Sequence, residues 1–244
     1  MQFFGLVAEG PTDYAVLENI LVGYFNKDIS GYINELHPKP GQAGGWQRVL
    51  KYCASQDFKN DFTDNDFMII QVDTDRSHEV NFDVPHTENG EGLTIESLIE
   101  KIKERFIGLF ESAFGADFIV KYGHRILFAI SVHAIECWLL PLYYENTTKA
   151  LTRGCLHCLN RKWLEIGEPV FGEDRKKKRV YVPNEQRRKP ISDSKVGQVP
   201  IYDKITKPFM DNTILKMCYP QNPSFKIFIE NELQMKVPLE NKEE

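Results

Sequence analysis

The sequence FMIIQVDTD at residues 67–75 decides the fold class. Five of its first six residues are apolar, and the run ends in two aspartates separated by one threonine. A short, nearly continuous apolar run of this kind is typical of a strand that is buried on both faces, as the strands of a parallel sheet are. We therefore predict a central strand over residues 67–72, with Asp73 and Asp75 just beyond its carboxyl end.

Similar runs lie on both sides of this segment and alternate with amphipathic stretches. Residues 3–8 (FFGLVA) and 125–132 predict two more buried strands, and residues 31–37 predict a further one. Apolar residues recur at helical spacing in the intervening segments, which predicts helices over 12–24, 46–55, 94–114 and 136–144. This alternation predicts an α/β protein with a mainly parallel sheet flanked by helices.

The pattern weakens after about residue 146. We expect an α/β domain over residues 1–145 and a helical C-terminal extension over residues 146–244, with helices at 203–217 and 224–234. A basic, proline-punctuated insertion around residues 173–190 interrupts this extension. Its cations are predicted to contact the phosphates of a nucleic acid, although a solvated loop explains them equally well. These cations are Arg175, Lys176, Lys177, Lys178, Arg179, Arg187, Arg188 and Lys189.

Composition excludes several classes of protein. The chain has 244 residues, of which 42% are hydrophobic and 27% charged, so it can bury a sizeable core and is neither collagen, coiled coil nor bulk disorder. The net charge is −5, but residues 161–190 carry +5, which leaves −10 on the rest of the chain. Such an acidic body disfavours a protein that coats nucleic acid non-specifically.

Segments that direct a protein to or through a membrane are not evident. No apolar run approaches the roughly 18–20 residues that span a bilayer, and the start of the chain lacks the pattern of a signal peptide. Five cysteines are an odd, low number that argues against a disulfide framework. We expect a cytoplasmic protein with no membrane association. Cys155 and Cys158 form one Cys-x-x-Cys pair, but a structural zinc site needs a second pair, so thiols within a helix are favoured.

Carboxylates follow three of the predicted strands. Glu9 comes after the first strand with Asp13 close behind it, Asp73 and Asp75 follow the central strand, and Glu136 lies just beyond the strand at 125–132. The carboxyl ends of parallel strands form the ligand-binding edge of an open sheet, so these groups are expected to converge there. Oxygen-only ligands at an open site suit Mg²⁺ or Mn²⁺.

Simpler interpretations exist for each of these carboxylates. Asp73 and Asp75 could belong to a solvated turn, and Glu9 or Asp13 could lie near a helix N-terminus, where negative charge is favourable. Glu136 stands within an apolar stretch, where an unpaired buried carboxylate would be costly. The occurrence of all these groups at three strand ends therefore favours a site.

Two of these segments resemble a known domain. LVAEGPTD at residues 6–13 has an apolar strand, then Glu-Gly, then an aspartate four residues after the glutamate. IIQVDTD at 69–75 has an apolar strand that closes in Asp-x-Asp. Together they resemble the two motifs of the Toprim domain of topoisomerases, primases and the overcoming-lysogenisation-defect nucleases. AISVHAIECWLL at 129–140 is similar to a further signature of small stand-alone bacterial Toprim proteins, and SFKIF at 224–228 is faintly similar to their closing segment.

The resemblance implies Mg²⁺- or Mn²⁺-dependent chemistry on phosphodiesters. It implies that Glu9 is a metal ligand or general acid–base group, that Asp73 and Asp75 hold metal, and that Asp13 and Glu136 support a second ion. The chain lacks a topoisomerase tyrosine domain, a primase zinc module and a P-loop. The nuclease branch is therefore the best match, which implies an endonuclease acting on DNA or RNA, an effector role in phage defence and a protein partner from the same locus.

Two alternatives remain open. Ala8 replaces the valine usual before the first glutamate, and Arg76-Ser77-His78 stands where a glycine often follows the aspartate pair. These departures suit a Toprim scaffold that binds a partner without catalysis. Alternatively, the segment Asp73-Thr74-Asp75 approaches the first motif of haloacid-dehalogenase phosphatases, in which the first aspartate is a nucleophile. That motif belongs on the first strand of its fold, which disfavours this interpretation.

Overall fold

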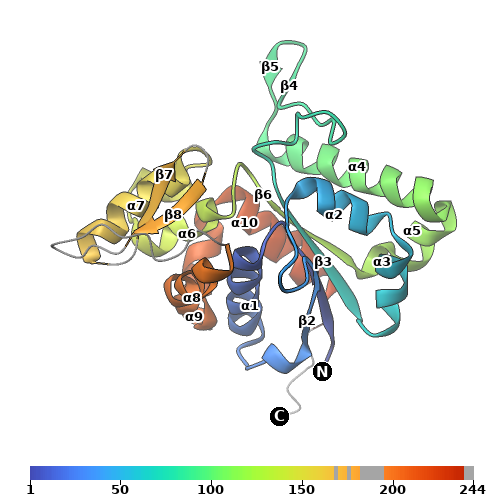
Figure 1. The fold of residues 1–244 in the computed structure, drawn as a ribbon, viewed down its shortest axis with the longest axis horizontal. Coiled ribbons are helices and arrows are strands. Elements are labelled where there is room, and N and C mark those ends of the chain that lie inside the picture. Colours follow the sequence, from blue (N-terminus) through green and yellow to red (C-terminus); the bar gives the residue numbers. More distant parts are fainter. Residues whose placement is uncertain (168–169, 175–176, 182–194, 239–244) are drawn as a thin grey trace.

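A four-stranded, entirely parallel sheet forms the centre of the molecule (Figure 1). The structure, a computed structural model, describes residues 1–167, 170–174, 177–181 and 195–238, with only the backbone course for those between 170 and 198. The spatial order of the strands is β2-β1-β3-β6. The strands are β1 (Phe4–Val7), β2 (Ile33–His37), β3 (Phe67–Asp73) and β6 (Ile126–Ser131). The predicted α/β class with a parallel sheet is therefore confirmed.

Helices cover both faces of this sheet, so alternate side chains of each strand enter two separate apolar clusters. Leu6 and Ile69 point into one cluster, and Val7 and Ile70 point into the other. The first cluster is covered by α1 (Pro11–Phe25), α6 (Glu136–Tyr143) and the C-terminal helices. The second cluster is covered by α2 (Trp46–Cys53), α3 (Gln56–Asn60), α4 (Ile95–Phe114) and α5 (Ala116–Tyr122).

Local sequence signals explain where the main helices begin. Pro11 lies at the start of α1, where the missing N–H of proline costs no helical hydrogen bond. Thr94 caps α4, because its Oγ1 accepts a hydrogen bond from Ser97 N at 3.1 Å. The polar stretch before β3 is also ordered. It forms α3 and a 3₁₀ turn at Asp61–Thr63, which bury Phe58 and Phe62.

The C-terminal extension packs against the first 145 residues and shares their core. It contains α7 (Cys155–Ile166), α8 (Lys195–Thr206), α9 (Asn212–Cys218), α10 (Pro223–Ile227) and a π-helical turn at Phe228–Gln234. Trp138 of α6 stacks on Phe225 and Phe228, with ring centroids 4.9 and 5.4 Å apart. Its indole N–H also donates to Ser224 Oγ at 2.9 Å.

The single helix predicted over residues 203–217 is wrong. α8 ends at Thr206, and a 3₁₀ turn at Lys207–Met210 separates it from α9. Pro208 lies in this turn, and proline cannot donate the backbone hydrogen bond that would continue α8. The turn also packs against α1 at Gly23, where an added Cβ would lie 1.8 Å from the carbonyl oxygen of Phe209.

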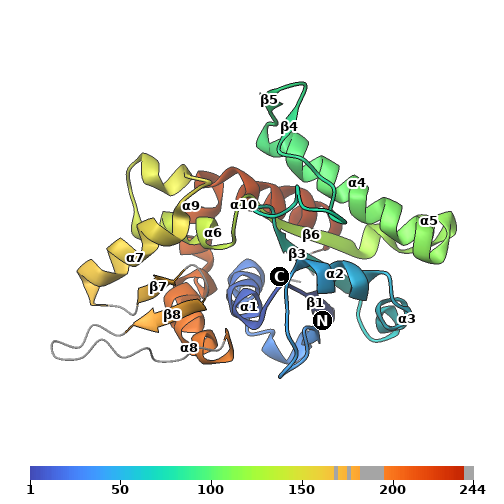
Figure 2. The same cartoon turned by 45° about the horizontal axis from the view of Figure 1, so that its top comes forward.

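The basic insertion is described only in part. Its first portion forms an antiparallel hairpin of β7 (Val170–Asp174) and β8 (Lys177–Tyr181). Lys177, Lys178 and Arg179 belong to β8, where only the backbone is described. Arg175, Lys176, Arg187, Arg188 and Lys189 lie outside the described residues. The hairpin and α7 lie on the opposite side of the molecule from α4 and α5 (Figure 2).

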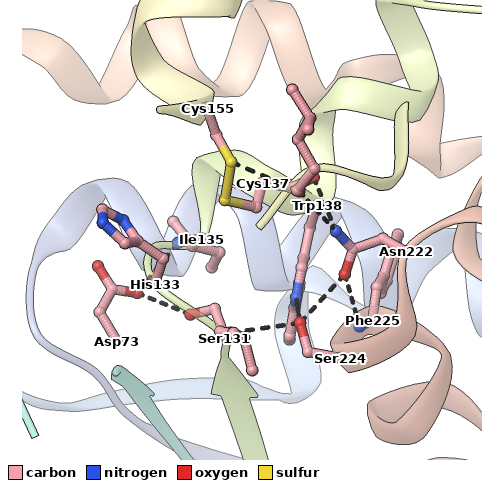
Figure 3. The surroundings of a disulfide bond; sticks show 12 residues. Asp73, Ser131, His133, Ile135, Cys137, Trp138, Cys155, Asn222, Ser224 and Phe225 are labelled. Atoms are coloured by element: carbon pink, nitrogen blue, oxygen red, sulfur yellow. Dashed lines mark hydrogen bonds between the residues drawn. A yellow bond between two sulfur atoms is a disulfide. The ribbon is translucent and has the colours of Figure 1, made fainter. Parts of the chain in front are cut away.

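The expectation that Cys155 is a thiol within a helix is wrong. Cys137 in α6 and Cys155 at the start of α7 form a disulfide, with Cα atoms 5.0 Å apart (Figure 3). Cys158 remains a free thiol, so Cys155 and Cys158 are not available together as zinc ligands. A pairing across 18 positions depends on how the two helices dock, which the cysteine count does not reveal.

Candidate functional site

Glu9 and Asp73 meet at the carboxyl edge of the sheet, as expected for groups that follow adjacent parallel strands. The backbone N–H of Asp73 donates to Glu9 Oε1 at 2.9 Å. In return, the backbone N–H of Glu9 donates to Gln71 Oε1 at 3.1 Å. This reciprocal pair of hydrogen bonds ties the end of β1 to the end of β3 and fixes the position of the Glu9 carboxylate.

The Asp73 carboxylate is held by one of its two oxygens. Oδ1 accepts hydrogen bonds from Ser131 Oγ at 2.7 Å, from Gln71 Nε2 at 3.0 Å and from the backbone N–H of Ile135 at 3.0 Å. Figure 3 shows the Ser131 contact and the second oxygen pointing away from it. Within the described part of the chain, Oδ2 accepts no hydrogen bond, so it is the oxygen that can face a ligand.

Like charges surround Asp73. Burial is the largest cause that raises its pKa well above the ordinary value, and the neighbouring carboxylates of Glu9, Asp13 and Glu136 raise it further. The hydrogen bond from Ser131 opposes this shift. Four carboxylates from three strand ends therefore lie within electrostatic reach of one another. Such an arrangement attracts cations.

Asp13 and Glu136 complete this cluster from two helix starts. Asp13 lies in the first turn of α1 and is 7% exposed, and Glu136 is the first residue of α6 and is 3% exposed. Tyr202 of α8 donates its hydroxyl to Glu136 Oε1 at 2.6 Å. Burial, and then the charge of Glu136 and this hydrogen bond, raise the pKa of the Tyr202 hydroxyl. The C-terminal extension thus supplies a fixed donor to the cluster. We call Glu9, Asp13, Asp73 and Glu136 the strand-end cluster.

Asp75 lies apart from the strand-end cluster. β3 ends at Asp73, so the strand alternation expected to bring the two aspartates to one side does not continue to Asp75. Its side chain is exposed, and its backbone N–H donates to the carbonyl of His133 at 3.1 Å. Asp75 is not among the charges that raise the pKa of Asp73.

A glycine-rich loop supports Glu9 from outside the sheet. Gly45 N–H donates to the backbone oxygen of Glu9 at 2.7 Å. At Gly44 an added Cβ would lie 1.8 Å from that same oxygen, so only glycine fits there. The close approach made possible by the loop at 41–45 is therefore to Glu9 itself. The sequence leaves both a phosphate loop and a simple turn open for this segment.

Three side chains of the site, Gln71, Ser131 and Tyr202, are not predicted from the sequence. Gln71 does have a recognisable signal, because a polar residue within an otherwise apolar strand needs hydrogen-bond partners inside the sheet. Ser131 stands at the end of β6, where a serine carries little information. Tyr202 gave no signal, because its contact with Glu136 joins residues 66 positions apart through the docking of α8.

The donor set of the strand-end cluster consists of carboxylate oxygens, which fits a hard divalent ion such as Mg²⁺ or Mn²⁺. Asp73 Oδ2 is directed away from its hydrogen-bond donors, as a metal ligand requires. Among the described residues, no three His, Cys, Asp or Glu side chains already form a closed metal-binding group. An ion would therefore have to draw these carboxylates closer together.

Comparison with protein-family models, curated proteins and solved structures gave no match for this chain. None of the helices in its described ranges has the length and apolar character needed to cross a membrane.

Proposed function

We propose that this protein is a divalent-metal-dependent endonuclease of the Toprim type. The observation that carries the proposal is the junction of Glu9 and Asp73 on adjacent parallel strands, with Asp73 Oδ2 directed away from its three donors. The resemblance of residues 6–13 and 69–75 to the two Toprim motifs supports the same conclusion. The nucleic acid is DNA or RNA, and an effector role in phage defence, with a protein partner, follows from the resemblance alone. The cytoplasmic location proposed with it follows from the low cysteine count of the sequence.

The residues of the site divide into ligands and supports. Glu9 and Asp73 would hold a Mg²⁺ or Mn²⁺ ion, and Asp13 and Glu136 would contribute to a second ion position. Such an ion supplies a Lewis acid for the phosphodiester and activates a water molecule. Gln71 and Ser131 orient Asp73 before any ligand binds, and Tyr202 orients Glu136.

Cleavage assays of an Asp73→Asn variant test this proposal. Single- and double-stranded DNA and RNA are incubated with Mg²⁺ or Mn²⁺, and initial cleavage rates are compared with those of the unmodified protein. We expect a loss of about 10³-fold, because a neutral amide replaces the ligand oxygen, as for other groups that stabilise the transition state. Asp64→Asn is the matched control, since Asp64 is exposed and precedes β3 at the other end of the sheet. Equal rates for Asp73→Asn and Asp64→Asn would contradict the proposal.

A non-catalytic scaffold is the second candidate. The departures from the Toprim pattern at Ala8 and at Arg76-Ser77-His78 favour it. If the protein binds Mn²⁺ through Asp73 in calorimetry yet cleaves none of these nucleic acids, the scaffold is the better description.

A further inference from the structure

A cavity of about 700 Å³ lies beside the strand-end cluster, on the β2 side of the sheet. Its walls come from the end of β2, the loop that follows it, α2 and α3. Its cationic lining residues are Lys39, Arg48 and Lys51, its carboxylates are Asp57 and Asp61, and His37 and Tyr52 complete the polar lining that bears on its chemistry. His37 is the last residue of β2, and its carbonyl accepts a hydrogen bond from the backbone N–H of Ala8 at 2.8 Å. The His37 end of the cavity therefore lies at the same edge of the sheet as Glu9.

Three cations line this cavity without ion-pair partners in the described part of the chain. Lys39, Arg48 and Lys51 are all exposed, and none of them lies within 4.0 Å of a described carboxylate. Asp61 accepts a hydrogen bond from the Tyr52 hydroxyl. The positive side of the cavity is therefore available to an anion from solution.

His37 supplies a second, independent sign of a ligand. Its ring stacks on Tyr52, with centroids 4.9 Å apart and an interplanar angle of 11°. Its Nε2 is buried and has no hydrogen-bond partner among the described residues. Burial, and then the charge of Arg48, lower the pKa of His37, so the neutral ring can present an N–H donor. A buried polar atom of this kind normally has a partner, and a phosphate oxygen in the cavity would provide one.

One loop connects the cavity to the strand-end cluster. Gln42 and Ala43 line the cavity, and two residues later Gly45 donates to the backbone oxygen of Glu9. Four carboxylates at the strand ends repel a polyanion, so a nuclease at this site needs cations close by to hold its substrate. The described part of the chain offers such cations at this cavity.

We propose that this cavity binds the phosphodiester backbone of the substrate strand next to the bond that is cleaved, through Lys39, Arg48 and Lys51. This inference rests on the proposed nuclease function and adds a substrate subsite to it. It places the phosphate-binding cations on the β2–α2 side of the molecule, whereas the sequence predicts them in the basic insertion around 173–190.

The test measures binding without metal, so that cleavage plays no part. Fluorescence anisotropy in EDTA follows a labelled single-stranded 12-nucleotide DNA, and the same sequence as RNA, over a series of salt concentrations. Arg48→Glu with Lys51→Glu is compared with the unmodified protein. Lys27→Glu is the control, because Lys27 is an exposed cation that follows α1 at the opposite end of the sheet. A neutral double variant, Arg48→Gln with Lys51→Gln, tests whether the charge reversal itself disturbs folding. Circular dichroism compares the folded state of all variants.

We expect the charge-reversed pair to bind at least 10-fold more weakly. Each lost phosphate contact on a single strand should also reduce the slope of log K against log salt by about 0.7. The neutral pair should show the same loss of slope with a smaller loss of affinity. Affinity and slope equal to those of Lys27→Glu would overturn the proposal. Competition by inorganic phosphate or a mononucleotide at the affinity of the oligonucleotide would also overturn it, because the cavity would then take a small anion.

The two proposals can fail separately. Oligonucleotide binding that depends on Arg48 and Lys51, together with unchanged cleavage in Asp73→Asn, would leave the subsite in place and reject the carboxylate mechanism. Cleavage that depends on Asp73 while both charge variants bind normally would reject the subsite alone.

Discussion

Two carboxylate sites in this molecule are built in opposite ways. Glu232, in the π-helical turn, is 1% exposed and lies between two lysines: its Oε1 is 2.8 Å from Lys103 Nζ and its Oε2 is 2.7 Å from Lys236 Nζ. Glu232 Oε2 also accepts the backbone N–H of Phe128 at 3.2 Å. At the strand-end cluster, in contrast, Asp73 is surrounded by three other carboxylates.

The difference distinguishes a carboxylate that stabilises the fold from carboxylates that are placed to bind a ligand. Glu232 joins the C-terminal segment to β6 and α4, and its charge is balanced by cations on both sides. Burial would lower the pKa of Lys103, but hydrogen bonds and charge from Glu232 and Glu100 raise it above the ordinary value. The strand-end cluster instead raises the free energy of the folded state by concentrating like charges. Such a cost is typical of a site that binds a ligand of opposite charge.

Removal of Glu232 should have the largest effect on stability. Glu232→Ala leaves two lysines and the N–H of Phe128 without their acceptor, so we expect a loss of about 3 kcal/mol, as for a broken buried ion pair. Urea unfolding measures it. Glu230→Ala is the control on the same turn, because Glu230 is 37% exposed and its contact to Lys226 is 3.8 Å long; we expect a change of at most about 0.5 kcal/mol.

The same urea unfolding experiment on Asp73→Asn should show that the two sites respond differently to the loss of a carboxylate. Removing one negative charge from the strand-end cluster relieves repulsion, which offsets part of the hydrogen bonding that Oδ1 loses. We therefore expect Asp73→Asn to be clearly less destabilising than Glu232→Ala. A loss for Asp73→Asn as large as that for Glu232→Ala would mean that the strand-end cluster is structural.

Local patterns predicted the sheet and its carboxyl edge, and tertiary docking determined the rest. The apolar runs at 3–8 and 67–72 place Glu9 and Asp73 at strand ends. Such runs can be recognised locally, because a strand that is buried on both faces consists mostly of apolar residues. Asp75 shows the limit of this reasoning, since β3 ends two residues before it. The contact from Tyr202 to Glu136 and the disulfide from Cys137 to Cys155 depend on how helices pack against each other. No local spacing encodes such packing.

A hydroxyl deletion at Tyr202 sharpens the comparison by reporting on the charge of Glu136. Tyr202 is 2% exposed, so Tyr202→Phe leaves the Glu136 carboxyl without this donor in a buried place. If Glu136 is ionised, the loss of stability should be about 1.5–3 kcal/mol, the range for hydrogen bonds to charged groups. Tyr144→Phe is the control, since the Tyr144 hydroxyl donates to the neutral carbonyl of Cys158 at 2.8 Å; its expected loss is about 1 kcal/mol. Equal losses for the two variants would indicate that Glu136 is protonated in the folded protein.

The pH dependence of stability should give the smallest effect and distinguishes the two groups by the pH range in which stability falls. Burial and the neighbouring carboxylates raise the folded-state pKa of Asp73 above its ordinary value of 3.8. The folded protein therefore holds this proton more tightly than the unfolded chain, so stability falls as the pH rises from about 4 through the raised pKa and then levels off. Lys103 has a consequence of the same sign in a different pH range: its raised pKa contributes stability below 10.5, which is lost as the pH rises through the folded-state pKa. Thermal unfolding in EDTA at a series of pH values should show the acidic slope in the unmodified protein, and Asp73→Asn should reduce it. Added Mg²⁺ should reduce the same slope, because an ion at the strand-end cluster favours the ionised carboxylates. An acidic slope that neither change affects would place its origin elsewhere in the molecule.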